Sequence, residues 1–198
     1  MVAATRQLGM LAYAQNGNMK QLLSLLAENI PVIVLQNNAI ALFPQWHYAV
    51  VIGYDIDAAE FILHTGVTES HRLNFSTFER TWQRGQYWML AMLPSDKTSK
   101  HLDPFIYAKA CQDLISTPLA AANWFAQGLP FAQQEVSYLN NYAMLLSELG
   151  CDIKAKELIA QALNIVPDDS NLLDSQNQIF LKATYRRAQQ QELKCRLP

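Results

Sequence analysis

The feature that most constrains the fold of this chain is a change of hydrophobic period along its length. Between residues 31 and 93 the apolar residues come in short β-branched runs, such as PVIVLQ and YAVVIGY. Runs of this kind are typical of buried strands. Beyond residue 104 the apolar residues recur three or four positions apart, which indicates helices. The sequence therefore predicts two regions of different secondary structure.

The first region predicts two helices followed by a meander of strands. We expect helices at residues 2–14 and 19–28, and strands at 32–35, 48–54, 60–64 and 87–93. A short helix at 78–83 is predicted before the last strand, because Ser76 can cap it and Glu79 follows three residues later. The order of helices and then strands indicates an α+β domain over residues 1–94.

A polar segment that closes with a proline, residues 95–104, is predicted to be a linker. The tail, residues 105–198, is predicted to be all-α and to contain a tetratricopeptide repeat, a helix-turn-helix unit of about 34 residues. The positions that match the repeat signature are Tyr142, Ala143, Gly150, Ala155, Ala162 and Pro167. A simple helical bundle is the alternative.

A degenerate repeat is expected before the clear one, one repeat length earlier in the chain. Its small and aromatic positions are Ala108, Ala121, Phe125 and Gly128. After Pro167, a final helix at 170–190 is predicted to cover the apolar face of the last repeat. We expect Lys182, Arg186 and Arg187 to lie on the solvent side of that helix.

Composition narrows the classes of partner and compartment. The net charge of -2 gives no basic field for a phosphate backbone, so nucleic acid is not an expected partner. No stretch approaches the roughly 20 apolar residues of a membrane span, and the start resembles no secretory signal, so a cytoplasmic location is expected. A cell-envelope location is the alternative if the chain belongs to a longer parent protein.

The three cysteines, Cys111, Cys151 and Cys195, lack the spacing of metal ligands. They predict three reduced structural thiols, and neither a disulfide framework nor a metal site. No cofactor is expected.

His47 is the candidate catalytic residue. It stands at the start of a predicted strand, between Trp46 and Tyr48, which we expect to shield it from water. A histidine that is held rigidly at the edge of a cleft can act as a general base. The spacing alone leaves a second interpretation open, in which His47 is a hydrogen-bonded structural side chain.

Residues 1–94 resemble the later part of bacteriocin-processing (double-glycine leader) peptidase domains, a papain-like family of bacteria, and particularly members with tetratricopeptide repeats after the peptidase domain. The resembling segments are the helix with Arg6, Gly9, Ala12 and Tyr13, then PVIVLQN, WHYAVVIGYD, FILHTG, FERTW and YWMLAMLP. The resemblance implies a partial papain-like fold in which His47 activates a cysteine thiolate. The implied reaction is acyl transfer from a peptide to that sulfur, followed by hydrolysis.

The chain departs from the family at two catalytic positions. The family's nucleophile lies on a helix upstream of the histidine, after an oxyanion-hole glutamine, and this sequence has no cysteine before Cys111. Thr65 stands where many relatives have an aspartate that orients the imidazole, and it offers no full charge. Asn37 is a second candidate for orienting His47. A nucleophile from the tail would reverse the family's chain order and is not expected.

These departures predict a truncated or catalytically incompetent cysteine peptidase-like protein whose repeat tail binds a peptide or protein. The alternative is the C-terminal part of an active cysteine peptidase whose nucleophile lies upstream of Met1. A scaffold without peptide specificity is a third interpretation. Because the family's N-terminal helix is missing, we also expect an exposed apolar sheet face or its burial in a homodimer.

Overall fold

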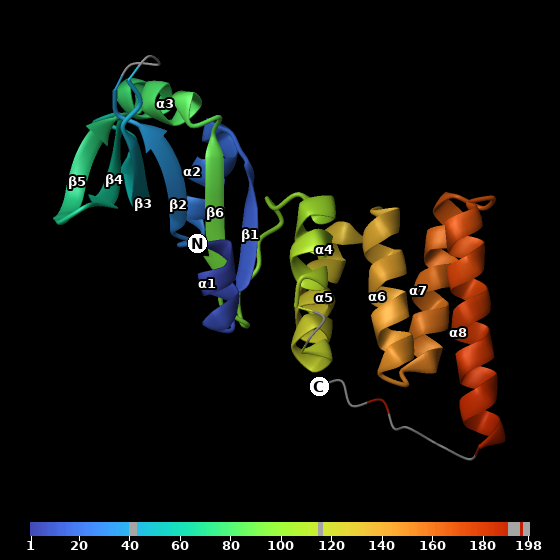
Figure 1. Ribbon diagram of the computed structural model, residues 1–198. Helices are drawn as coiled ribbons and strands as arrows, with labels where there is room; N and C mark the ends of the chain where they lie inside the picture. Colours follow the sequence, from blue (N-terminus) through green and yellow to red (C-terminus); the bar gives the residue numbers. More distant parts are fainter. Residues whose placement is uncertain (40–42, 115–116, 190–194, 196–198) are drawn as a thin grey trace. The chain divides into compact units, whose positions relative to one another are not determined.

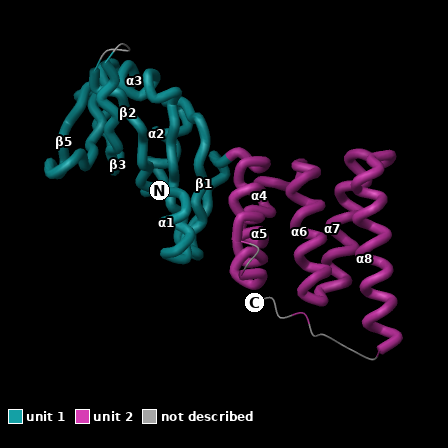
Figure 2. Tube along the Cα trace, viewed as in Figure 1, with its two compact units in different colours: residues 1–102 teal, residues 103–198 magenta. Residues whose placement is uncertain are grey.

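The structure is a computed structural model that describes residues 1–39, 43–114, 117–189 and 195. It divides into two compact units, Met1–Leu102 and Asp103–Pro198 (Figure 2). The described part of the first unit contains both strands and helices, which confirms its α+β character. The described elements of the second unit are helices, which confirms a helical tail.

The first unit is built on an antiparallel sheet of six described strands (Figure 1). In sheet order they are β1 (Leu11–Asn16), β6 (Trp88–Leu93), β2 (Val32–Asn37), β3 (Trp46–Asp55), β4 (Glu60–Thr65) and β5 (Thr68–Asn74). The helices of this unit are α1 (Val2–Gln7), α2 (Met19–Ala27) and α3 (Phe75–Arg84). The predicted helix at 19–28 and the four predicted strands are confirmed, within a few residues at their ends.

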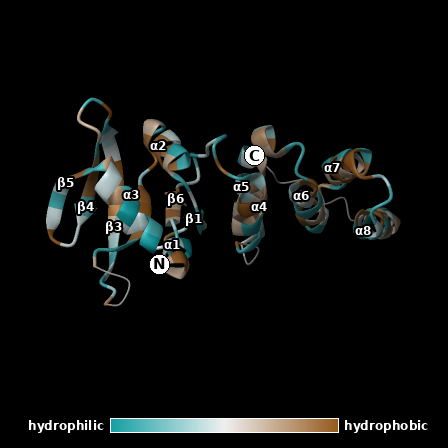
Figure 3. Ribbon diagram, turned by 90° about the horizontal axis from the view of Figure 1, so that it is seen from above, coloured by the Kyte–Doolittle hydropathy of each residue, from teal (hydrophilic) through white to brown (hydrophobic). Residues whose placement is uncertain are grey.

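The two faces of the sheet differ, because side chains alternate along each strand. On one face Val34, Val51 and Phe61 are fully buried, and Phe61 packs on Phe78 of α3 with ring centroids 4.4 Å apart. The helices α1 and α2 lie on opposite sides of the sheet (Figure 3). On the side of α1, a small cluster of Ala12, Ile33 and Leu90 is buried with Val2 packed against it.

Two predictions for the first unit are wrong. The chain from Leu11 onward forms β1 and not the end of a helix, because Gly9 has a φ of +72° and Leu11–Asn16 pairs with β6 along its whole length. Asn74, and not Ser76, caps α3, since its Oδ1 accepts the Ser76 N–H at 3.0 Å. The strand β5 was not predicted, because its side chains are polar and largely exposed and so carry no alternating apolar signal.

The second unit contains the described helices α4 (Pro104–Gln112), α5 (Pro118–Ala132), α6 (Val136–Glu148), α7 (Asp152–Ile165) and α8 (Ser170–Ala188). Asp103 caps α4, accepting the Ile106 N–H at 3.0 Å. The helix α6 packs against α7 and also against α8. The starts of α5 and α7 are 34 residues apart, and so are those of α6 and α8. Among the described residues, no helix has the length and apolar composition needed to cross a bilayer.

Aromatic side chains and one glycine fill the core between α4, α5 and α6. The Tyr107 hydroxyl donates to the Trp124 carbonyl at 3.0 Å, and the Tyr138 hydroxyl donates to the Phe125 carbonyl. A Cβ atom at Gly128 would lie 2.5 Å from both the Tyr107 ring and the Tyr138 hydroxyl. Close packing of these helices therefore requires glycine at this position.

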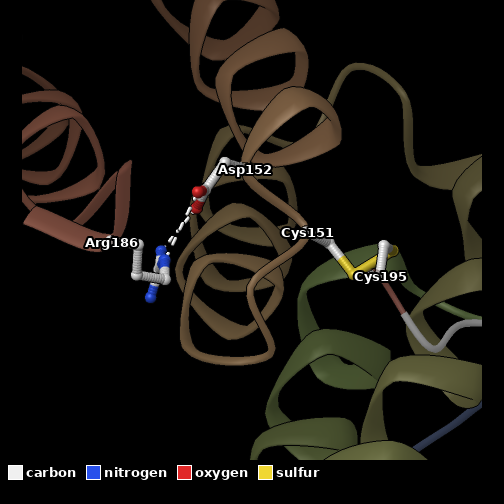
Figure 4. The surroundings of a disulfide bond; sticks show 4 residues. All are labelled: Cys151, Asp152, Arg186 and Cys195. Carbon is white, nitrogen blue, oxygen red and sulfur yellow. Dashed lines mark hydrogen bonds and ion pairs between the residues drawn. A yellow bond between two sulfur atoms is a disulfide. The ribbon is translucent and has the colours of Figure 1, made fainter. Parts of the chain in front are cut away.

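The prediction of three reduced thiols is wrong for two of them. Cys151, just before α7, forms a disulfide with Cys195 (Figure 4). Cys111 is the free thiol, and it is buried. A bond across 44 residues contributes about 4 kcal/mol to stability in the chain-entropy picture.

The prediction that the basic side chains of α8 lie on its solvent side is only partly correct. Arg186 forms a salt bridge with Asp152 at the start of α7 (Figure 4), and Lys182 forms one with Glu148 at the end of α6. Arg187 is exposed, as predicted. The first two side chains therefore join α8 to the preceding helix pair.

Tyr142 lies in the core of the second unit. It is 0% exposed, and its ring stacks on Phe125 with centroids 5.3 Å apart. Its hydroxyl has no hydrogen-bond partner among the described residues. Burial raises the pKa of Tyr142 to about 12.

We expect Tyr142→Phe to keep or raise the free energy of unfolding, by up to about 1 kcal/mol, because it removes a buried hydroxyl without a partner. The wild type should also lose stability between about pH 10 and pH 12, since Tyr142 in the unfolded chain loses its proton at a pH where the folded chain retains it. This alkaline loss should be smaller in the variant. Urea unfolding at pH 8 and at several alkaline pH values measures both effects.

Tyr138→Phe is the matched control, because it removes a hydroxyl that donates to the Phe125 carbonyl. It should lower the free energy of unfolding by about 1 kcal/mol. Equal losses in the two variants at pH 8 would contradict the assignment.

Candidate functional site

His47 is the second residue of β3, and the strand register determines its neighbours. It pairs with Gln36 of β2, and Ala49, two residues further on, pairs with Thr65 of β4. Residues that oppose each other in an antiparallel pair point to the same face. Gln36, His47 and Thr65 therefore form a row across three strands, on the sheet face that carries Val34 and Val51.

Thr65 is the direct partner of His47. The His47 Nε2 atom lies 2.5 Å from the Thr65 Oγ1 atom, and both side chains are half-buried. A threonine hydroxyl can accept a proton from a ring nitrogen or donate one to it, so it can fix the ring's orientation. It adds no negative charge, so it cannot stabilise an imidazolium as a carboxylate would.

Gln36 lies on the other side of His47 and was not predicted as a site residue. It is 2% exposed, and its Nε2 atom donates to the Thr81 Oγ1 atom of α3 at 2.7 Å. The Thr81 hydroxyl in turn donates a hydrogen bond to the Phe78 carbonyl at 2.8 Å. Gln36 thus anchors α3 next to His47. A buried glutamine at the end of an apolar run is the sequence signal for it, but its pairing with His47 depends on the register.

Asn37 stabilises the chain that follows β2. Its Oδ1 atom accepts the backbone N–H groups of Ala39 at 3.0 Å and Gln45 at 2.9 Å, and Arg84 donates to its carbonyl at 3.1 Å. In the register Asn37 pairs with Trp46, so its side chain lies on the sheet face opposite to that of His47. The structure therefore brings Thr65, and not Asn37, to His47.

Trp46 and Tyr48 do not shield His47 from water as expected. They point to the opposite sheet face, where they are 57% and 49% exposed. Tyr48 packs edge-to-face on Trp88 with ring centroids 5.8 Å apart. These aromatic side chains form an exposed apolar patch on the sheet.

None of the three cysteines offers a reactive thiolate. Cys111 is fully buried in the second unit, and this burial raises the pKa of its thiol. Cys151 and Cys195 are joined to each other. Among the described residues, no group of three or more histidine, cysteine, aspartate or glutamate side chains is placed to hold a metal ion.

No protein-family model matches this chain, and no curated protein sequence matches it. A crystal structure named "putative C39-like peptidase from Bacillus anthracis" aligns with 46% of this chain at 15% sequence identity and a TM-score of 0.39. The alignment covers 55% of the length of that chain. Likeness at this TM-score does not fix the fold, so the family remains an expectation that rests on the sequence segments.

We expect Thr65→Val to lower the free energy of unfolding by about 0.5 to 1.5 kcal/mol, because it leaves the His47 ring nitrogen without its partner in a half-buried site. Thr68→Val is the matched control, since Thr68 pairs with Thr65 but is exposed at the sheet edge. Urea unfolding of the two variants measures the difference. Equal changes in both would contradict a structural role for the hydroxyl.

Proposed function

We propose that this chain is a catalytically incompetent, papain-like cysteine peptidase-like protein whose helical tail binds a peptide or protein. One observation carries the proposal: His47 has an orienting partner in Thr65, whereas every cysteine is either buried or in a disulfide. The histidine of a Cys–His pair is therefore present. No cysteine of this chain is available as its nucleophile.

The chemistry of the resembled family requires the missing half. In that mechanism a thiolate within hydrogen-bond reach of the histidine attacks the peptide carbonyl and becomes acylated. Loss of the nucleophile from such a unit costs on the order of a million-fold in rate. His47 in this chain can therefore orient or bind a polar group, but it has no thiolate to activate.

The helical tail supports the tetratricopeptide-repeat interpretation. The helix pairs α4–α5 and α6–α7 are followed by α8, with a spacing of one repeat length from α5 to α7 and from α6 to α8. The small positions of the signature are fully buried where helices meet, at Ala143, Ala155 and Ala162. Gly150, between α6 and α7, has a φ of +76°, which suits glycine.

The spacing of the two salt bridges on α8 also supports the repeat interpretation. Glu148 and Lys182 are 34 residues apart, and so are Asp152 and Arg186. The Glu148–Lys182 pair thus joins equivalent positions of α6 and α8, whereas the Asp152–Arg186 pair joins α7 to α8. Stacking of equivalent helices is the property that gives repeat proteins a continuous binding surface.

We propose that the peptide-binding surface lies on the less buried side of α6, next to its contact with α8. Asn140, Met144 and Glu148 lie four residues apart and therefore on one side of α6, and Glu148 reaches Lys182 of α8. Asn140 has a buried Oδ1 atom with no hydrogen-bond partner among the described residues. When the half-buried amide side chain turns outward, this oxygen can accept a backbone N–H of an extended peptide.

Binding is tested with a phage-displayed library of random 12-residue peptides, selected on the full chain. For the enriched peptide we expect Asn140→Ala to weaken binding at least tenfold, because it removes a hydrogen-bonding anchor. Lys154→Ala, at an exposed position of α7, should leave the affinity unchanged. Fluorescence anisotropy of the labelled peptide gives both affinities. Failure to enrich any peptide, or equal affinities in both variants, would contradict the binding surface.

Catalytic incompetence is tested with fluorogenic peptides that carry a double-glycine site. The chain should not hydrolyse them, with or without dithiothreitol, because reduction frees only Cys151 and Cys195 of the second unit. Hydrolysis that iodoacetamide blocks and that His47→Ala abolishes would show that a thiolate reaches His47. That result would overturn the proposal.

The second candidate function is an active cysteine peptidase whose nucleophile lies upstream of Met1. The pairing of His47 with Thr65 and the exposed patch of Trp46 and Tyr48 favour it, because a preceding helix could cover that patch. In-frame reading of the genomic DNA before the Met1 codon tests it. A glutamine and a cysteine at a predicted helix start support this candidate, and an immediate stop codon removes it.

We propose the cell envelope as the location of this protein. The Cys151–Cys195 disulfide supports it, since such bonds persist in oxidising compartments and are rare where thioredoxin and glutathione keep thiols reduced. This replaces the cytoplasmic expectation, which rested on the absence of a recognisable signal in the sequence.

A further inference from the structure

The helix α8 is apolar on two opposite sides. Its inner side is buried against α6 and α7, and the apolar residues there are Leu172, Ile179 and Ala183. Its outer side carries four large apolar residues that are 42% to 71% exposed, Leu173, Phe180, Leu181 and Tyr185, here called the outer stripe. A helix that is apolar on both sides is typical of a position between two neighbours.

The preceding repeat shows what kind of element fits the outer stripe. Leu173 and Phe180 follow Leu139 and Leu146 of α6 by one repeat length, and both of these leucines are 0% exposed. In that repeat the equivalent helix, α6, packs against the following helix α7. Figure 3 shows α8 at the end of the row, with no described helix beyond it. The outer stripe therefore suits an antiparallel amphipathic helix.

We propose that the outer stripe is a self-association surface, on which α8 of a second copy packs antiparallel across a two-fold axis. The second copy supplies a helix of the required kind, with an accessible apolar stripe at helical spacing. At 1.5 Å per residue the 19 residues of α8 give a contact about 28 Å long. With the axis between Phe180 and Leu181, each of these side chains meets the other in the opposite copy, as an isologous contact requires.

The charges on α8 are compatible with this contact. Asn177 and Thr184, which lie within the outer stripe, are uncharged and would face each other across the axis. Asp174 lies on the same side of α8, seven residues before Leu181, and would face the exposed Arg187 of the second copy. Lys182 and Arg186 are already neutralised by Glu148 and Asp152 of their own copy. The residues of α8 therefore place no unpaired like charges opposite each other at the axis. Lys156 of α7 also lies near the axis, where its Nζ atom is 4.4 Å from the centroid of the Phe180 ring and forms a cation–π contact with it.

Analytical ultracentrifugation over a range of protein concentrations tests the proposal. The wild type should sediment as a dimer of 22.4 kDa chains. Leu181→Glu and Tyr185→Glu should each weaken dimerisation at least tenfold, because they place two charges in an apolar contact. Gln134→Glu is the matched control, since it adds the same charge at an exposed position in the turn between α5 and α6, outside α8, and it should remain dimeric.

Two stripe variants are used because Leu181 and Tyr185 are 71% and 64% exposed, so neither change should unfold the chain. Circular dichroism checks that each retains its helices. A monomeric wild type, or stripe variants that dimerise as well as Gln134→Glu, would overturn the proposal. So would a dimer that Tyr48→Glu dissociates and the stripe variants do not, because the contact would then lie on the sheet. The result does not depend on whether the tail binds peptides.

Discussion

The arrangement of the candidate site depends on the antiparallel register of β2, β3 and β4. This register places Gln36, His47 and Thr65 in one row, with His47 2.5 Å from the threonine hydroxyl. It also places Asn37 on the opposite face, although Asn37 adjoins Gln36 in sequence. A shift by one residue would exchange the two faces and separate His47 from Thr65. The backbone pairing of three strands therefore decides which side chain orients the histidine.

The second unit is held together by different means. Aromatic rings and Gly128 pack in its core, where the tyrosine hydroxyls of α4 and α6 bond to backbone carbonyls of α5. At its C-terminal end, two salt bridges and a disulfide connect α8 and Cys195 to the α6–α7 pair. These interactions all join different segments of the chain, so they depend on helix stacking and not on single helices.

Both units leave an apolar surface exposed, and the two surfaces differ in what they imply. On the sheet, Trp46 and Tyr48 of β3 form a patch on the face opposite to that of His47. On α8, Leu173 and Phe180 of the outer stripe follow the fully buried Leu139 and Leu146 of α6 by 34 residues. Only the second surface has an internal precedent for its occupant, because the chain itself shows the equivalent helix packed against another helix.

The sequence by itself determined the helix at 19–28, four of the strands and the helical tail, because apolar periodicity and capping chemistry are local properties. His47 as the candidate site residue stays a prediction. It was wrong about β1, about the cap of α3 and about two cysteines. It also left both Thr65 and Asn37 as partners of His47. The tertiary structure decided those points, since strand pairing, the choice of sheet face and the meeting of Cys151 with Cys195 depend on residues far apart in the chain.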